Sequence, residues 1–204
     1  MVSTSDMRAA WGPACNGGSM TTIDFGDNGA RVTVAKATVP VWRAVEAIFA
    51  KHGYGIRQAD TGAYDCRAIT GGTDYSLHAY GIAVDVNWQS NPYGSTLVTD
   101  MPPGAIRDIE ALEVDGVPVI RWGGRYSGNK DAMHFEVIVP PATASRFQSQ
   151  EDDIVTEEQM QRLENVAQNQ GKLTRKLVAT LFEREKGRDQ RSTAEILEAI
   201  EGEG

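Results

Sequence analysis

The sequence of 204 residues predicts an α+β fold: a small mixed domain with a central antiparallel sheet, followed by a C-terminal helical tail. Three observations predict it. Apolar residues recur at helical spacing after Pro40, residues 82–88 and 133–139 alternate between apolar and polar side chains, and the composition becomes strongly helical from residue 154. The hydrophobic fraction of 41% and the charged fraction of 24% are ordinary for a globular protein, so a packed core is expected.

The N-terminal part of the chain is predicted to hold one helix and one strand. The beginning is rich in Gly, Ser, Thr and Asn, and we expect an irregular lead-in over residues 1–35. A helix then begins, because Pro40 suits a first turn, and Gly53 stops it. Residues 54–58 are expected to form a short strand, and the Gly-rich residues 70–73 a loop.

Two segments have the period of two that is typical of half-buried strands. In residues 82–88 the apolar side chains face one way, and Asp85 lies at the centre of the polar face. In residues 133–139 the polar face carries His134 and Glu136. Both strands are therefore expected to carry, on one face, polar side chains that can bind a metal or transfer a proton.

The predicted domain covers residues 36–140. Within it, a short helix is expected at residues 105–112 and a further strand at residues 117–122. The polar residues 141–153 are expected to form a linker, and residues 154–204 a helical tail whose apolar residues follow a rough seven-residue rhythm. The tail either packs on the domain or associates with a copy of itself, and we favour self-association.

Charge and hydropathy exclude some classes of function. The formal net charge of −8 argues against a nucleic-acid binder, which needs clustered Lys and Arg. No stretch approaches the roughly 18 continuous apolar residues of a membrane span, and the N-terminus lacks the pattern of a secretory signal. We therefore expect a protein that is made in a cytoplasm. Cys15 and Cys66 either pair or stay thiols, and the compartment favours thiols.

The first candidate site lies at residues 76–85, which read Ser-Leu-His-Ala-Tyr-Gly-Ile-Ala-Val-Asp. On one straight strand His78 and Asp85 would point to opposite faces, because their separation is odd. Gly81 lies between them and can turn the chain, which would place His78 at the rim before the strand. Ala83 is small and shares the face of Asp85, so it leaves room for a metal and a substrate.

The second candidate site reads Asp-Ala-Met-His-Phe-Glu over residues 131–136. A catalytic zinc usually takes three protein ligands, and a carboxylate nearby accepts the proton of the water that attacks the substrate. Asp131 and Glu136 are both candidates for that base. From the residues alone, a metal site and a pair of hydrogen-bonded core histidines both remain open.

At these residues the sequence resembles the M15 metallopeptidases. The motif Ser-x-His-x-x-Gly-x-Ala-x-Asp, followed by Asp-x-x-His-Phe-Glu, is similar to that of D-Ala-D-Ala carboxypeptidases and dipeptidases and of phage L-alanyl-D-glutamate endolysins. The resemblance covers about residues 36–140. It implies that His78, Asp85 and His134 bind Zn²⁺ and that Asp131 is the catalytic base. Glu136 then supports a ligand or pairs in the core.

The resemblance also implies residues that contact the substrate. An arginine before the first motif stabilises the developing oxyanion in this family, and Arg67 fits that place; the alternative is a surface ion pair. Ser76, Tyr80 and Trp122 are expected to contact the substrate. Ser76 could equally brace the turn at His78, and core packing is the default for an aromatic residue such as Trp122 near a strand.

The function expected from this resemblance is zinc-dependent hydrolysis of the stem peptide of bacterial peptidoglycan. We favour a phage endolysin that cuts the bond between L-Ala and D-Glu, made in the host bacterial cytoplasm and released to the cell wall by a holin. The alternatives are a D-Ala-D-Ala carboxypeptidase of the same family and a non-catalytic, zinc-stabilised cell-wall binding module. No partner other than peptidoglycan is expected, neither nucleic acid nor membrane, apart from self-association through residues 154–204.

Overall fold

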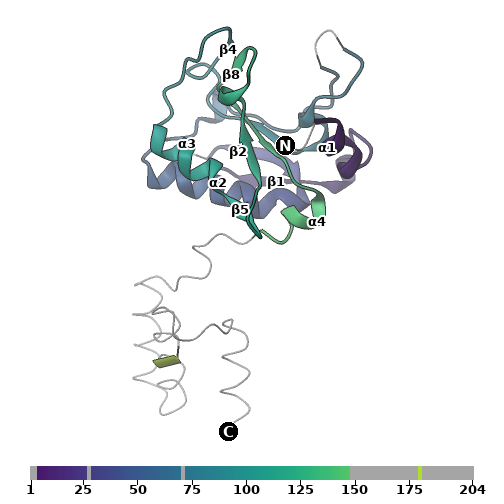
Figure 1. The fold of residues 1–204 in the computed structure, drawn as a ribbon, viewed down its shortest axis with the longest axis horizontal. Helices are drawn as coiled ribbons and strands as arrows, with labels where there is room; N and C mark the ends of the chain where they lie inside the picture. The colour runs from purple at the N-terminus through teal and green to yellow at the C-terminus, as the bar shows by residue number, and fades with distance from the viewer. Residues whose placement is uncertain (1–3, 27–28, 70–71, 148–178, 181–204) are drawn as a thin grey trace. The chain divides into compact units, whose positions relative to one another are not determined.

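The computed structural model describes residues 4–26, 29–69, 72–147 and 179–180. The chain divides into two compact units, Met1–Ser149 and Gln150–Gly204. The helical tail predicted over residues 154–204 lies outside the described residues except at two positions, so it stays a prediction. The mixture of helices with small antiparallel sheets in the first unit agrees with the predicted α+β class (Figure 1).

The prediction of an irregular lead-in over residues 1–35 is wrong. Its residues form helix α1 (Thr4–Trp11) and an antiparallel hairpin of strands β1 (Met20–Asp24) and β2 (Arg31–Ala35). The hairpin forms because Val32 and Val34 alternate with polar residues and are buried in the core. This alternation spans only a few residues, and the many Gly, Ser and Thr residues around it kept the strand from being predicted.

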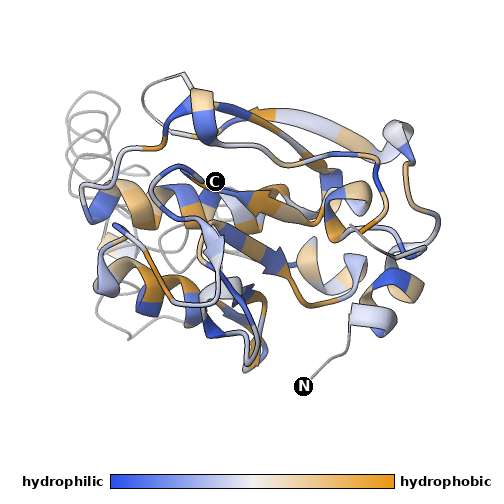
Figure 2. Ribbon diagram, turned by 90° about the horizontal axis from the view of Figure 1, so that it is seen from above, coloured by the Kyte–Doolittle hydropathy of each residue, from blue (hydrophilic) through white to orange (hydrophobic). Residues whose placement is uncertain are grey.

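Helix α2 (Val39–Lys51) confirms the predicted first helix, with proline in its first turn. Its buried face includes Trp42, Val45 and Phe49. The Phe49 ring packs edge-on against Phe135, with ring centroids 5.8 Å apart. The helix thus supplies one wall of the core, and Figure 2 shows apolar stretches on the helices and on the strands between them.

The central sheet has three antiparallel strands in the order β3 (Ala83–Asp85), β9 (His134–Val137) and β7 (Ile120–Trp122). The two alternating segments therefore form strands as predicted, and these strands are neighbours. Their register pairs Asp85 with His134. Because directly opposed residues of an antiparallel pair project to the same face, the sheet alone brings these two side chains together.

The strand expected over residues 54–58 is not formed. The backbone N–H of Tyr54 donates to the Phe49 carbonyl at the end of α2, and that of Arg57 donates to the side-chain oxygen of Asn87. Gln58 already belongs to the 3₁₀ helix η3 (Gln58–Asp60), and residues 54–57 pair with no strand within the described ranges. A run of extended residues needs a partner to become a strand, and the sequence did not show that none was present.

The remaining elements are short. Helix α3 (Pro103–Glu110) confirms the helix expected near residue 105. The strand expected at residues 117–122 is split into β6 (Val117–Pro118), which pairs with β5 (Glu113–Val114), and β7. Helix α4 (Pro141–Ala144) lies at the start of the predicted linker.

A second two-stranded ribbon pairs β4 (Tyr93–Gly94) with β8 (Lys130–Asp131), and the two strands are side by side in Figure 1. Its β8 strand ends three residues before His134. The ribbon therefore adjoins the central sheet at the point where the second histidine motif begins.

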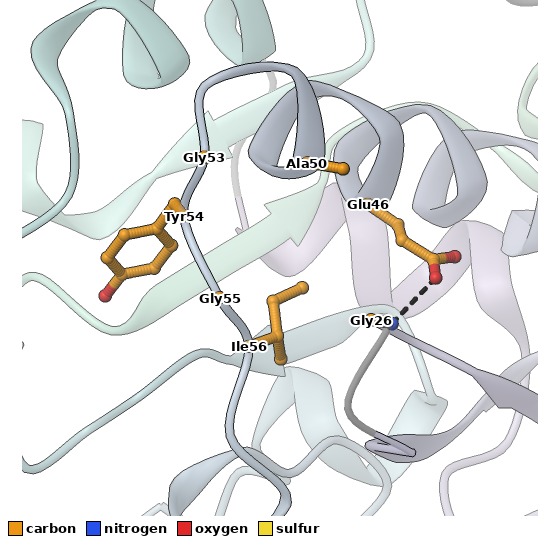
Figure 3. A pocket seen from close by; sticks show the side chains of 7 residues that line it. All are labelled: Gly26, Glu46, Ala50, Gly53, Tyr54, Gly55 and Ile56. Carbon is orange, nitrogen blue, oxygen red and sulfur yellow. Dashed lines mark hydrogen bonds between the residues drawn. The ribbon is translucent and has the colours of Figure 1, made fainter.

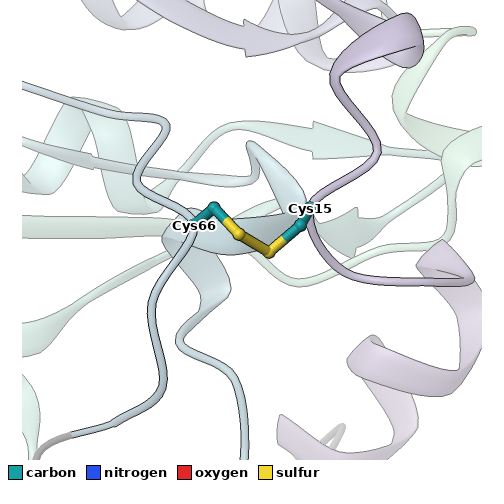
Figure 4. Close-up of a disulfide and its surroundings, with 2 residues drawn as sticks. All are labelled: Cys15 and Cys66. Carbon is teal, nitrogen blue, oxygen red and sulfur yellow. A yellow bond between two sulfur atoms is a disulfide. The ribbon is translucent and has the colours of Figure 1, made fainter.

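A disulfide joins Cys15 to Cys66 (Figure 4), with their Cα atoms 5.1 Å apart. The preference for free thiols was therefore wrong, because it rested on compartment and could not account for how close the fold brings the two cysteines. The Cys15 N–H also donates to the Ala79 carbonyl at 2.8 Å. The bridge thus fastens the N-terminal segment to the loop that precedes the first histidine motif.

A pocket of about 220 Å³ lies between the end of α2 and the end of β1 (Figure 3). On its wall, the Glu46 carboxylate accepts a hydrogen bond from the Gly26 N–H at 2.7 Å. Neither histidine motif contributes to this pocket. None of the helices within the described ranges has the length and apolar character needed to cross a membrane.

Candidate metal centre

His78 is placed by a single tight turn. The 3₁₀ helix η4 (Leu77–Tyr80) begins at Ser76, whose hydroxyl accepts a hydrogen bond from the His78 N–H at 3.3 Å. The turn ends at Gly81, with a φ of +68°. A Cβ at Gly81 would lie 2.7 Å from the Ala35 backbone nitrogen, so only glycine fits there. The turn predicted between the first histidine and its strand is thus present.

The structure brings the three predicted ligands into one buried cluster. The Asp85 carboxylate lies 2.9 Å from His134 Nδ1 through one oxygen and 3.2 Å from His78 Nε2 through the other. The two ring nitrogens are 3.3 Å apart. One ligand atom from each residue lies within 4.8 Å of the others, a spacing that suits a single bound metal ion. His78 is 4% exposed and His134 9%.

Each histidine has a partner on the nitrogen that points away from the cluster. His78 Nδ1 lies 2.7 Å from the Ala63 carbonyl oxygen, so this nitrogen carries the proton and Nε2 is free to bind a metal. His134 Nε2 lies 3.7 Å from the Glu136 carboxylate, which leaves Nδ1 directed to the cluster. Both rings are therefore oriented before any ion binds.

Glu136 belongs to a buried network behind His134. Arg121 donates to its carboxylate from the opposed position on β7, and the Tyr126 hydroxyl donates to it at 2.8 Å. Burial alone would raise the pKa of Glu136, but His134 and Arg121 outweigh it and lower the pKa to about 2. A carboxylate that is ionised, 2% exposed and held by two donors is suited to support His134 and poorly suited to exchange protons.

The charges of the cluster favour a cation. Burial raises the pKa of Asp85, but the two histidines outweigh this effect and hold it well below its usual range. Burial lowers the pKa of His134, but Asp85 and Glu136 outweigh it and raise that pKa to about 10. Two ionised carboxylates thus surround the histidines, and either a proton or a metal ion can balance them.

Asp131 lies beside the cluster on β8. One of its carboxylate oxygens, Oδ1, is buried and has no hydrogen-bond partner among the described residues. Burial raises the pKa of Asp131 above its ordinary value; His134 opposes this shift and the negative charge of Asp85 reinforces it. A carboxylate oxygen without a hydrogen-bond partner, in a carboxyl group of raised pKa, is what a general base near a metal site requires.

The 3₁₀ helix η5 (Gly123–Arg125) packs against Asp131 and His134 at Gly123. A Cβ at this position would lie 2.5 Å from the Asp131 carbonyl oxygen and 3.2 Å from the His134 Cβ. The absence of a side chain at Gly123 therefore lets the candidate base and one ligand approach each other. The pair of glycines at 123–124 was not singled out in the sequence.

Arg67 and Ser76 lie on the loop that leads to His78. The Arg67 guanidinium is exposed and pairs with Asp65 at 2.7 Å, while its carbonyl accepts the Ser76 N–H. The structure therefore places Arg67 next in space to the start of the histidine turn, with its side chain in a surface ion pair. Ser76 braces that turn, which is the second of the two roles considered for it.

Two expected substrate contacts are not at the cluster. Trp122 is 3% exposed, its indole N–H donates to the Ala132 carbonyl, and its ring stacks on Phe135. It holds the turn between Asp131 and His134 and has no free face for a substrate. Tyr80 lines a different pocket of about 260 Å³, whose walls include none of the three ligands. Both aromatic rings turn into the core, as is usual beside strands.

Three supporting groups were missed from the sequence: the Ala63 carbonyl, Gly123 and Arg121. Arg121 could have been found, because a charged residue in the middle of an apolar strand usually has a buried partner. The Ala63 carbonyl and Gly123 carry no signal in a single sequence. They act through backbone atoms or through the absence of a side chain.

Two histidines and one aspartate beside an open carboxylate are the donor set of mononuclear metal-dependent hydrolases. Residues 70–137 match the family model described as D-alanyl-D-alanine carboxypeptidase. This match includes all three ligands and Asp131, and it supports the resemblance of this segment to the M15 peptidases. No curated protein and no solved structure matches the chain.

Proposed function

We propose that the protein is a zinc-dependent peptidase that hydrolyses one peptide bond in the stem peptide of bacterial peptidoglycan. The observation that carries this proposal is the buried cluster of His78, Asp85 and His134, with its ligand atoms within 4.8 Å of one another in the segment that matches the family. Imidazole nitrogen and carboxylate oxygen are ligands that zinc prefers, and three of them leave a position for water.

The residues present fit the ion in two further respects. The second nitrogen of His78 is occupied by a backbone carbonyl and that of His134 faces Glu136, so neither ring has to turn on binding. Asp85 also supplies a negative charge, which a divalent cation would balance in place of the proton that His134 holds. When bound, zinc would supply a Lewis acid for the scissile carbonyl and would acidify the water that attacks it.

The chain itself supplies the proton transfers. Asp131 Oδ1 has no partner among the described residues, and we propose that it accepts the proton of the attacking water. Asp131 would then return that proton to the departing amine, since the raised pKa of its carboxyl makes it a competent acid as well as a base. Glu136 does not serve in this role, because Arg121 and Tyr126 both donate to its Oε1 and its Oε2 faces the His134 ring.

Arg67 is proposed to stabilise the oxyanion that forms at the scissile carbonyl. Its present ion pair with Asp65 is exposed, and such pairs contribute only about 0–1 kcal/mol. The guanidinium can therefore leave Asp65 for the substrate at little cost. The Ser76 N–H donates to the Arg67 carbonyl beside the histidine turn, and this proximity supports the proposed role.

We propose that the bond cut is the one between L-Ala and D-Glu and that the enzyme is a phage endolysin. Lysis requires the peptide mesh to be broken, and cleavage at that bond breaks it. The description of the matching family model favours a second candidate, removal of the terminal D-Ala. A binding module that only recognises the peptide would have no use for the open carboxylate of Asp131.

Replacement of the proposed base tests this function. Asp131→Asn keeps the shape of the side chain but cannot accept a proton, so turnover of purified peptidoglycan should fall below detection while bound zinc stays at one per chain. Asp115→Asn is the matched control, because Asp115 is exposed and its positive φ of 52° suits asparagine. An Asp131→Asn protein as active as the control would refute the assignment.

A further inference from the structure

Tyr93 lies opposite the proposed base and points toward the same side. The register of the β4–β8 ribbon pairs Tyr93 with Asp131. Directly opposed residues of an antiparallel pair project to one face, with Cβ atoms about 4.5–5.5 Å apart. Tyr93 is 59% exposed, so most of its ring is open to solvent beside the half-buried carboxylate.

The Tyr93 hydroxyl is oriented and has its proton available. The side-chain amide of Asn129 donates a hydrogen bond to this oxygen at 2.7 Å. A phenol that accepts one hydrogen bond still has its own O–H to donate. In the part of the chain that the structure describes, no acceptor is hydrogen-bonded to that O–H. Tyr93 therefore presents an oriented, unused donor from the position directly opposite Asp131 in the ribbon.

The proposed chemistry determines what part of the substrate reaches this donor. Asp131 must hand its proton to the departing amine, so the nitrogen of that amine has to come within hydrogen-bonding distance of Asp131 Oδ1. The residue that begins with this amine then lies along the β4–β8 ribbon. Its carbonyl or carboxylate oxygen is the acceptor within reach of a side chain on the neighbouring strand.

We propose that Tyr93, oriented by Asn129, binds the leaving-group residue of the substrate peptide through a hydrogen bond to a carbonyl or carboxylate oxygen. This inference rests on the proposed function. In this proposal, the β4–β8 ribbon recognises the part of the substrate that departs with the amine. A carboxylate acceptor would gain more than a neutral carbonyl, because hydrogen bonds to charged groups are the stronger ones.

The test compares Tyr93→Phe with the wild-type protein on two short stem-peptide substrates. They differ only in whether the leaving residue ends in a free carboxylate or in a carboxamide. Loss of the hydroxyl should lower kcat/KM roughly threefold to tenfold on the carboxamide and more than tenfold on the acid, mostly through KM. Zinc content and unfolding midpoint should not change, because Tyr93 is exposed.

Tyr75→Phe is the matched control, since Tyr75 is also an exposed tyrosine and lies outside the ribbon. Unchanged kcat/KM in Tyr93→Phe, or an equal loss in Tyr75→Phe, would overturn the inference while leaving the proposed function in place. If the wild-type protein released no product from either substrate, the proposed function itself would fail, and this inference with it.

Discussion

Gly123 is the position where one added methyl group should disturb the site most. Replacement by alanine introduces no backbone strain, because Gly123 does not have a positive φ. Its Cβ would lie 2.5 Å from the Asp131 carbonyl oxygen, so the two must separate by about 0.9 Å to reach an ordinary contact of 3.4 Å. The same methyl group would press on the His134 Cβ at 3.2 Å.

A displacement near 1 Å at a proposed base should cost about 100-fold in kcat. Overpacking should also lower the free energy of unfolding by about 1–3 kcal/mol. The assay is the initial rate of peptide release from purified peptidoglycan at saturating substrate, with urea unfolding measured in parallel. Gly128→Ala is the control, because a Cβ there meets no atom within 4 Å.

The result that would refute this reasoning is a Gly123→Ala protein with the rate and the urea midpoint of Gly128→Ala. It would mean that Asp131 and His134 tolerate displacement, and that their close packing on η5 does not position the chemistry. A loss of stability with full activity would separate the two effects and would contradict the positioning role alone.

Three further predictions follow from the network around the cluster. Arg121→Met leaves the buried Glu136 carboxylate without its cation and should lower the free energy of unfolding by about 3–5 kcal/mol, measured in urea against the exposed-helix control Arg107→Met; equal midpoints would contradict it. Loss of the Cys15–Cys66 bridge in Cys15→Ser should cost about 4 kcal/mol in the chain-entropy description of its 51-residue separation, and a change below about 1 kcal/mol would rule that out. In the metal-free protein, the raised pKa of His134 gives stability that is complete below the ordinary histidine pKa of about 6.5 and is lost as pH rises through about 10. The thermal midpoint of the chelator-treated protein should therefore fall between pH 7 and 10, more steeply than in His134→Gln, and parallel curves would contradict the linkage.

The strands and the turn that carry the candidate ligands could be predicted from the sequence because their signals are local, whereas the zinc-ligand roles of His78, Asp85 and His134 came from the resemblance to the M15 metallopeptidases. The alternation around Asp85 and around His134 needs only a few consecutive residues to identify a strand and its polar face. The turn at Gly81 follows from the odd spacing of His78 and Asp85. Each of these inferences depends on backbone geometry within ten residues, and the structure agrees with all of them.

The surroundings of the site depend on which distant segments lie side by side, and one sequence does not reveal this. The register that sets Tyr93 opposite Asp131 and Arg121 opposite Glu136 joins separate parts of the chain. The disulfide was misjudged for the same reason. Trp122 was placed at the substrate because its strand was predicted without knowing which face the core covers.

The central claim is that a zinc ion held by His78, Asp85 and His134 drives hydrolysis of a stem-peptide bond. Mass spectrometry of the fragments released from purified peptidoglycan, with and without a chelator, tests it most directly. The account predicts a peptide with a new N-terminal D-Glu or D-Gln, whose release stops with chelator and returns with added zinc. Bound zinc with no released fragment, or release that the chelator does not affect, would contradict it.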